Sequence, residues 1–236
     1  ISNQVTGVTT SAFEPALDYC VVKIPRWPFD KFEKGDRTIG TQMKATGEVM
    51  AIERNFESAL LKAIRALDIS SISQLKDKSL KANEVEDLYP DDTRLFKIFK
   101  LLRKGVALED IYKFTGIDKW FLTKLKIIIN HEKQLRNIKK LDKEILKISK
   151  KIGFSDETIA LLTNNSVQEI RNFRKKWSIL PTYKMVDTCA SEFEALTPYY
   201  YSTYEFENEA EPDKTDKAIV LGSGPIRIGQ GIEFDY

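Results

Sequence analysis

The chain has 236 residues, of which 42% are hydrophobic and 31% charged, a composition typical of a globular protein. Its 37 Lys and Arg almost balance its 35 Asp and Glu, and the resulting net charge of +2 predicts no polyanionic partner. One histidine, His131, and two cysteines, Cys20 and Cys189, are too few for a structural zinc site, a haem c attachment or a disulfide framework. No stretch approaches the roughly 18 apolar residues of a membrane span. We therefore expect no membrane association, and the widely spaced cysteines indicate a reducing, cytoplasmic setting.

The first section of the chain is expected to be α+β. A β-rich run over residues 17–24 predicts a strand that ends at Pro25. Residues 41–45 and 48–52 flank a Thr-Gly pair, which predicts a hairpin between these two runs. A helix is expected to follow from the N-cap Asn55.

Helical periodicity dominates the middle of the chain. After a polar connector at residues 70–90, the apolar spacing is helical from residue 91 to Pro181. Helix starts and ends are predicted from capping signals at Gly105, Gly116, Asp118, Gly153, Ser155 and the capping box Ser166 to Glu169. Five or six short helices in this stretch predict an all-α domain, so the fold class is expected to be mainly α.

The end of the chain contains a short apolar run, residues 217–221, followed by a glycine-rich turn. A strand that enters such a turn is typical of the first strand of a Rossmann-like unit. The turn has the spacing G-x-G-x-x-x-x-G from Gly222 to Gly229, which is not the dinucleotide fingerprint, and no Lys-Ser/Thr pair follows it. A tight connection is therefore favoured over phosphate binding.

Basic helices at residues 119–151 raise the alternative of a helical nucleic-acid-binding module. This stretch has eleven Lys and Arg against three acids, whereas residues 187–216 have nine acids and one lysine. The cations fall between the apolar positions, which favours a solvated helix face over a DNA-binding surface. We expect the two oppositely charged regions to meet each other or a partner protein.

The sequence gives little support for catalysis by this chain alone. His131 lies in the middle of a predicted helix between two polar residues and is expected at the surface. Cys20 lies in an apolar strand and is expected to be a buried small side chain rather than a nucleophile. Cys189 has no cationic neighbour that would activate it. Glu48 and Glu233 are conceivable general bases, but spacing assigns neither of them a partner.

Several segments carry a family resemblance. Residues 13–27 (Phe-Glu-Pro-Ala-Leu-Asp-Tyr-Cys-Val-Val-Lys-Ile-Pro-Arg-Trp) resemble the carbamoyl-phosphate synthase large chain near the end of its first ATP-grasp half. The resemblance continues through residues 41–52, 117–122, 187–193 and 201–204, in the order of the family. Residues 222–236 (Gly-Ser-Gly-Pro-Ile-Arg-Ile-Gly-Gln-Gly-Ile-Glu-Phe-Asp-Tyr) are similar to the opening of the second half.

This resemblance implies three sections. Residues 1–68 would end the carboxyphosphate-forming ATP-grasp domain, and residues 69–209 would be the helical oligomerisation domain. Residues 210–236 would begin the carbamoyl-phosphate-forming domain, with the first strand of its Rossmann-like pre-ATP-grasp part. We expect an internal segment of a longer protein, since the chain begins with Ile1 and not with methionine.

The resemblance also implies an activity. The family makes carbamoyl phosphate from bicarbonate, ammonia or glutamine and two ATP, for arginine and pyrimidine biosynthesis, and uses magnesium and potassium. Its partner is a glutaminase, either a small subunit or a fused domain, and self-association is expected through the helical domain. Residues that bind ATP and metal are expected outside this chain, so the isolated segment should be inactive. By resemblance, Glu48, Gly231 and Glu233 match positions that line the tunnel between the two active sites of the family.

Overall fold

The computed structural model describes residues 1–2, 10, 12, 17–29, 31–67, 80, 82–186, 199–211 and 215–221. Its helices are α1 (Phe56–Ala66), the 3₁₀ helix η1 (Val85–Asp87), α3 (Arg94–Lys104), α4 (Leu108–Thr115), α5 (Lys119–Asn137), α6 (Lys143–Ile152), α7 (Asp156–Thr163) and α8 (Val167–Lys176). Its strands are β1 (Cys20–Arg26), β2 (Gly47–Glu53), β3 (Thr182–Val186) and β4 (Tyr199–Thr203). The described part is mostly helical, which confirms the prediction of a mainly α fold.

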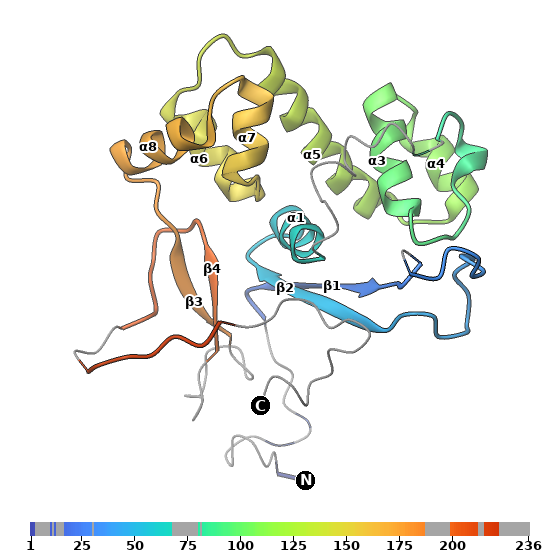
Figure 1. Cartoon of the computed structure of the whole chain (residues 1–236), viewed down its shortest axis with the longest axis horizontal. Coiled ribbons are helices and arrows are strands. Elements are labelled where there is room, and N and C mark those ends of the chain that lie inside the picture. The colour runs from blue at the N-terminus through green and yellow to red at the C-terminus, as the bar shows by residue number, and fades with distance from the viewer. Residues whose placement is uncertain are drawn as a thin grey trace.

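The elements are arranged around α1. In Figure 1, α5 runs from the α3–α4 pair to the group of α6, α7 and α8, and α1 lies beneath this row of helices. The β1–β2 hairpin covers the other side of α1, and the β3–β4 hairpin lies beside it below α8. Helix α1 therefore contacts both the helices and the first sheet.

The two strands of the first section pair with each other in an antiparallel ladder, with Val22 opposite Ala51. The predicted hairpin between residues 41–45 and 48–52 is wrong, because β2 pairs with β1 and residues 41–45 form no strand. A Thr-Gly pair was a weak turn signal, and the longer apolar run of β1 offers β2 a better partner. Strand β1 also continues through Pro25, which is tolerated because β1 has one neighbouring strand and needs no amide donor on its outer edge.

Helix α1 begins where the sequence predicts. The side chain of Asn55 accepts a hydrogen bond from the amide of Ser58, which confirms it as the N-cap. The buried face of α1 consists largely of small and medium side chains, including Ala59 and Ala63 at 0% exposure. This face rests on the β1–β2 hairpin, where Val49 and Ala51 are also buried.

Each of the helices α3 to α8 has one end at a predicted capping residue. Gly105, Gly116 and Gly153 end α3, α4 and α6 in the left-handed conformation that glycine adopts most easily. Asp118 and Ser155 accept backbone hydrogen bonds at the first turns of α5 and α7. Ser166 and Glu169 form the predicted capping box of α8. Local chemistry therefore accounts for most of the helix boundaries.

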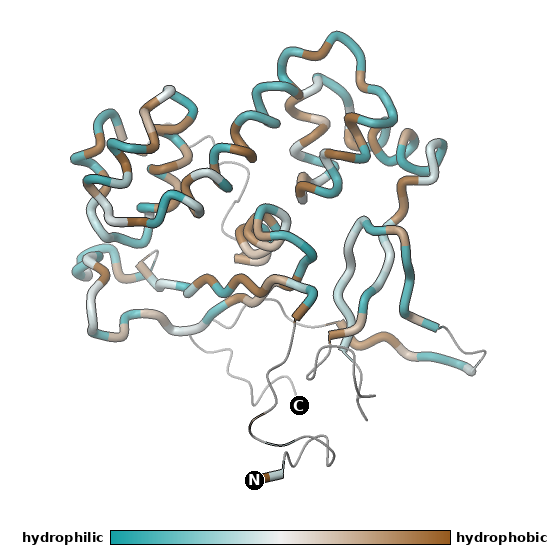
Figure 2. Tube along the Cα trace, turned by 180° about the vertical axis from the view of Figure 1, so that it is seen from behind, coloured by the Kyte–Doolittle hydropathy of each residue, from teal (hydrophilic) through white to brown (hydrophobic). Residues whose placement is uncertain are grey.

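The core of the helical section is built from large side chains. In Figure 2, hydrophobic residues (brown) alternate with hydrophilic ones (teal) along the helices of this section, whereas α1, at the centre of the view, is mostly brown. The largest fully buried apolar side chains of the described chain all lie between residues 88 and 170: Leu88, Ile98, Phe99, Leu101, Ile111, Leu122, Ile129, Leu135, Leu146, Ile159 and Ile170. Burying each of them contributes roughly 1.5–3 kcal/mol of transfer free energy.

The last described section contains a hairpin that the sequence analysis missed. Strands β3 and β4 are antiparallel, with Lys184 opposite Tyr201. Tyr201 is buried and its ring lies 6.0 Å from that of Tyr19, whereas Tyr199 and Tyr200 are exposed.

The strand predicted at residues 217–221 is wrong for this structure. These residues form neither helix nor strand, and the side chains of Ile219, Val220 and Leu221 are more than 80% exposed. An apolar run forms a strand only where another strand supplies hydrogen-bond partners, and no described segment pairs with this one. The ATP-grasp and Rossmann assignments and the domain limits at residues 68 and 209 stay predictions.

Candidate functional site

Glu48 lies near the start of β2, on the exposed side of the first hairpin. Its carboxylate is 2.6 Å from the ammonium of Lys23, and both side chains are 53% exposed. An ion pair with this exposure contributes about 0–1 kcal/mol to stability. Glu48 is therefore not needed to hold the hairpin, and its side chain is accessible to other groups.

The other predicted tunnel positions, Gly231 and Glu233, lie outside the described residues, as do Cys189 and the glycine-rich turn from Gly222. Their proximity to Glu48 therefore stays a prediction. Within the described residues, no group of three or more His, Cys, Asp or Glu side chains is arranged to hold a metal ion. Among the same residues, no helix combines the length and hydropathy that a bilayer span requires.

His131 is buried, with 6% exposure, so the prediction of a surface position is wrong. Its ring lies on the inner face of α5, where Nε2 is 2.8 Å from the hydroxyl of Ser149 and the ring centroid is 5.3 Å from that of Phe154. Burial lowers the pKa of His131, and a hydrogen bond with Gln134 opposes this only in part. The residue packs α5 against α6 and is not placed to act as a base on a solvent-accessible substrate.

Cys20 is only partly buried, since it begins β1 at the end of the hairpin. Burial raises the pKa of its thiol, and the nearby carboxylate of Glu57 raises it further. The thiol is therefore protonated at neutral pH, which agrees with the expectation that Cys20 is no nucleophile.

Many cations of the basic helices form ion pairs with carboxylates of the same chain. Glu132 on α5 binds the guanidinium of Arg103, with an oxygen 2.8 Å from Nη2, and also pairs with Arg136. Further pairs link cations of residues 119–151 to Glu109, Glu57, Asp156 and Glu205: Lys119, Lys124, Lys150 and Lys151, respectively. These pairs favour a solvated helix face over a continuous surface that binds phosphate groups of a nucleic acid.

The acidic stretch, residues 187–216, contacts the basic helices through its described part. This confirms the expectation that the two oppositely charged regions meet each other. Lys151 on α6 lies 3.0 Å from the carboxylate of Glu205, and its ammonium is 4.6 Å from the ring centroid of Phe206. Lys184 on β3 contacts Glu207 at 3.2 Å and Glu209 at 2.8 Å. Opposite charges therefore hold the segment after β4 against α6 and β3.

Helix α1 joins the helical section through backbone contacts at the end of α6. The side-chain amide of Asn55 donates to the backbone carbonyl of Lys151 at 3.1 Å. The guanidinium of Arg65 donates to the backbone carbonyl of Gly153 at 2.6 Å. Gly153 lies so close to α1 that a Cβ atom there would be 2.6 Å from the Cα of Ser58. Only glycine permits this approach, since Gly153 also has a φ of +102°.

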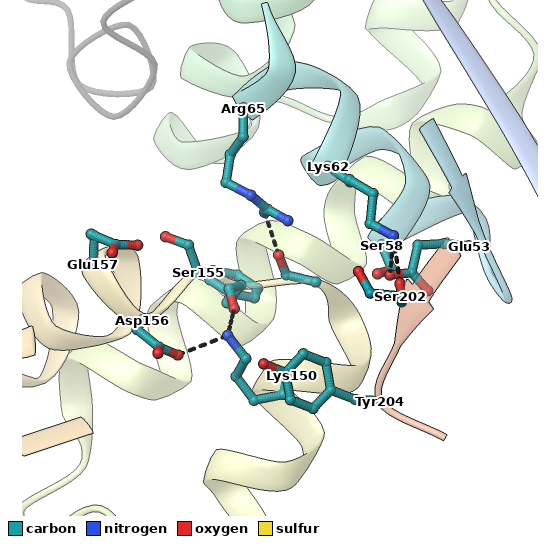
Figure 3. Close-up of a pocket in the computed structure, with 12 residues that line it drawn as sticks. Glu53, Ser58, Lys62, Arg65, Lys150, Ser155, Asp156, Glu157, Ser202 and Tyr204 are labelled. Atoms are coloured by element: carbon teal, nitrogen blue, oxygen red, sulfur yellow. Dashed lines mark hydrogen bonds and ion pairs between the residues drawn. The ribbon is translucent and has the colours of Figure 1, made fainter. Parts of the chain in front are cut away.

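Lys62 joins the two hairpins across the same helix. Its ammonium donates to the carbonyl of Ile52 at 2.9 Å and to the carbonyl of Ser202 at 2.6 Å, and it lies 2.8 Å from the carboxylate of Glu53. Figure 3 shows Lys62 between Glu53 and Ser202. One side chain of α1 thus connects β2 to β4.

A buried group of ion pairs links α6, α7 and α8 next to these contacts. Lys150 lies 2.8 Å from one oxygen of Asp156, and Arg174 lies 2.5 Å from the other. Burial lowers the pKa of Lys150, although Asp156 opposes the shift. Burial raises the pKa of Asp156, but hydrogen bonds from Lys150 and Arg174 outweigh it, so that this pKa lies below its usual value. Asp156 is therefore ionised near neutral pH.

The α4–α5 end presents aromatic side chains to solvent. Trp120 and Phe121 at the start of α5 are 52% and 45% exposed and pack edge to face with each other and with Phe56. Phe114 on α4 is also exposed and contacts the ring of Tyr89 at 6.5 Å. Exposed aromatic clusters of this kind mark contact surfaces more often than isolated exposed residues do.

The contacts around α1 were missed by the sequence analysis. Gly153 appears there only as a cap, and Lys62 and Arg65 are not singled out. Nothing in the spacing of these residues predicts contacts between segments 88 to 140 positions apart. Gly153 carried part of the signal, since a C-cap glycine that is followed at once by a new helix forces a tight corner.

Together, the fold and these contacts define a helical domain tied on both sides to short β segments. Residues 48–178, more than half of the chain, match the family described as carbamoyl-phosphate synthetase large chain, oligomerisation domain. The chain belongs to this family.

Relatives match the chain over its whole length. Proteins named carbamoyl phosphate synthase large chain are 56% identical over 240 residues in Caldanaerobacter subterraneus subsp. tengcongensis and 55% identical over 241 residues in Thermoanaerobacter sp. strain X514. The protein of that name from Clostridium botulinum strain Alaska E43 is 56% identical over 242 residues. The match includes 100% of this chain but 22% of the first two relatives and 23% of the third. The chain thus spans about a fifth of their length, and none of these comparisons supports the nucleic-acid-binding alternative.

Proposed function

We propose that this chain is the part of a carbamoyl-phosphate synthase large chain that mediates self-association and connects the two active halves. The observation that carries the proposal is the uninterrupted similarity over the whole chain to proteins of that name. The intact protein would make carbamoyl phosphate from bicarbonate, ammonia or glutamine and two ATP, with magnesium and potassium, for arginine and pyrimidine biosynthesis. A glutaminase subunit or fused glutaminase domain would supply the ammonia, and the cytoplasm is the proposed setting.

The connecting role is supported by the contacts of α1. Arg65 binds the helical section at Gly153, and Lys62 binds β2 and β4 at once. The segments before and after the helical section are therefore fixed to the same helix. A connector that must hold two catalytic halves in a defined relation needs this kind of rigid attachment at both ends.

The self-associating role is supported by the exposed aromatic side chains Phe114 and Trp120. If they form the contact between copies, Phe114→Glu or Trp120→Glu should lower the assembly state of the intact protein, because a buried unpaired carboxylate is strongly disfavoured at an interface. Sedimentation velocity across a range of concentrations measures this directly.

Leu161→Glu is the matched control for this experiment. Leu161 is 44% exposed on α7, at the other end of the helical section, and its replacement should leave the assembly unchanged. Unchanged assembly in both aromatic variants would show that another surface mediates self-association. Salt-sensitive loss of assembly would instead point to contacts between charged groups.

By resemblance, the residues that bind ATP and metal lie outside this chain, so no step of the reaction is assigned to it. Residues 1–236 incubated with ATP, bicarbonate and ammonia should therefore release no carbamoyl phosphate above the background. Turnover by this segment would contradict the proposed division of labour between the sections.

By resemblance, Glu48, Gly231 and Glu233 would line the tunnel for carbamate. The accessible side chain of Glu48 is compatible with such a place. A bulky replacement, Gly231→Phe, should uncouple ATP hydrolysis from carbamoyl phosphate formation in the intact protein, because the side chain would fill the path. The ratio of ADP to carbamoyl phosphate measures coupling. An unchanged ratio would contradict the proposal that Gly231 lines the tunnel.

A further inference from the structure

A polar pocket with a volume of about 280 Å³ lies where α1, the α6–α7 connection and β4 meet. Figure 3 shows Arg65 reaching into it from α1, opposite Lys150 and Tyr204. The pocket is large compared with a single water molecule, which occupies about 30 Å³ in the liquid, and approaches the roughly 300 Å³ of small ligand sites.

Arg65 is the cation of this pocket that lacks a counter-ion among the described residues. Its guanidinium donates to the carbonyl oxygen of Gly153, and no described carboxylate lies within 4.0 Å of it. Burial lowers the pKa of Arg65, and the more distant carboxylates of Glu53 and Glu157 oppose this shift only in part. A partly buried guanidinium has five donors, so most of its hydrogen-bonding capacity is available to a ligand.

Two hydroxyl groups add to this capacity. Ser58 is 3% exposed and Tyr204 is partly buried, and the hydroxyl of neither makes a hydrogen bond with another described residue. Burial raises the pKa of Tyr204 to about 12, so its phenol is protonated and able to donate. Two cations also flank this residue, since the ammonium of Lys150 lies 4.9 Å and the guanidinium of Arg174 5.3 Å from the centroid of the Tyr204 ring.

The acidic residues of the pocket wall do not neutralise Arg65. Glu53 is paired with Lys62, and Asp156 is paired with both Lys150 and Arg174. Glu157 is 48% exposed and its nearest cation is Arg171, at 3.8 Å. The guanidinium of Arg65 therefore has no described carboxylate in direct contact and lies beside two hydroxyl donors.

We propose that this pocket binds a small oxyanion of phosphate or carboxylate type, held by Arg65 together with the hydroxyl groups of Ser58 and Tyr204. Hydrogen bonds from a charged donor to an oxyanion are short and about twice as strong as neutral ones. The bound anion would touch α1 and β4 at once and would stabilise their contact by mass action. The inference rests on these contacts alone and does not depend on the proposed function.

The test uses the intact protein and two probes, inorganic phosphate and acetate, titrated by calorimetry at constant ionic strength with chloride as the balancing anion. Saturable binding of at least one probe is expected, and the thermal unfolding midpoint should rise with its concentration. The two probes distinguish a tetrahedral oxyanion from a carboxylate.

Tyr204→Phe is the sharpest variant, since it removes one hydroxyl and leaves the ring and its packing in place. It should weaken binding about tenfold, the effect expected for a hydrogen bond to a charged group. Tyr199→Phe is the matched control, because Tyr199 lies on β4, the strand that Tyr204 directly follows, is 71% exposed and does not line the pocket. This variant should bind the probes as the wild type does.

Arg65→Met should abolish saturable binding, and circular dichroism would verify that this variant is folded. Absence of saturable binding of both probes by the wild type would overturn the proposal. So would binding that is equally tight in Tyr204→Phe and in the wild type, since the anion would then bind elsewhere.

Discussion

The β1–β2–α1 section and the α3–α8 section bury apolar surface in different ways. The core between α1 and its hairpin combines small side chains such as Ala59 and Ala63, at 0% exposure, with larger ones such as Ile64, at 2%. The helical core relies on large ones, among them Phe99 and Ile129, both at most 1% exposed. Small residues allow close approach of backbones but supply little buried area per residue.

This difference indicates which section depends on the other. A two-stranded hairpin is marginal on its own and needs a covering element. Helix α1 provides that cover, and it is in turn attached to α6 through Asn55 and Arg65. The helical section has its own core of large residues, so we expect the first section to lose its structure before the helical section does.

The largest effect is expected from removing a large side chain of the helical core. Phe99→Ala should lower the free energy of unfolding by about 3–5 kcal/mol, because it leaves a cavity in addition to the lost transfer energy. Urea denaturation followed by circular dichroism measures it. Phe114→Ala truncates the same side chain at a position with 43% exposure and should cost less than about 1 kcal/mol. Similar losses in both variants would contradict the assignment of the core.

The next effect compares a buried with an exposed ion pair. Lys150→Met should cost about 3 kcal/mol, since it leaves the buried carboxylate of Asp156 with Arg174 as its one close cation. Lys23→Met removes the exposed partner of Glu48 in the hairpin and should cost about 0.5 kcal/mol or less. The same denaturation assay measures both variants. A larger decrease in the free energy of unfolding for Lys23→Met than for Lys150→Met would contradict the assignment of the buried pair as the more stabilising one.

A smaller effect is expected where the two sections touch. Gly153→Ala should cost about 2–3 kcal/mol, because the residue has a positive φ and its new Cβ would overlap the backbone of Ser58. Gly105 has a similar φ of +90° but open space around it. Gly105→Ala should therefore lower the free energy of unfolding by about 1 kcal/mol, from the backbone conformation alone. Equal losses would show that the close contact between α1 and α6 is not needed for stability.

The smallest effect concerns the single histidine, which lies in the helical section. The pKa of His131 is lowered by burial in the folded chain, so the unfolded chain binds the proton more readily. Its contribution to stability is therefore complete above the unfolded pKa of about 6.5 and decreases as the pH falls below that value. The urea midpoint of the wild type should fall between pH 7.5 and 5.5.

The control for this pH effect is His131→Gln, in which the midpoint should fall less over the same range. Carboxylates contribute equally in both proteins, so the difference between the two slopes isolates the histidine. Parallel slopes would show that the imidazole titrates normally in the folded state.

Helix ends and the helical fold class were predictable from sequence because they depend on neighbouring residues. Asn55, Asp118 and Ser155 cap helices through groups two or three residues away, and Gly105 acts within its own turn. The pairing of β2 with β1, by contrast, depends on competition between distant segments. The hairpin prediction failed there because a local turn signal was given more weight than the longer partner strand.

The position of His131 was also within reach of the sequence. It lies three residues after Ile128 and four before Leu135, which places it on the buried stripe of α5. Polar neighbours at 130 and 132 concealed this spacing. The pocket beside Arg65 was not predictable, since residues of α1, α6, α7 and β4 approach one another only through the tertiary fold.

The hydrogen bond from Lys62 to Ser202 also has a consequence for how the chain acquires its structure. It connects residues that are 140 positions apart, so it closes only after the whole helical section between them has been synthesised. Contacts of such long range form late, because the entropy of the intervening chain must be lost first. During translation, helix α1 therefore emerges together with the β1–β2 hairpin that covers its apolar face, but well before β4, and the ammonium of Lys62 lacks its Ser202 partner for that interval.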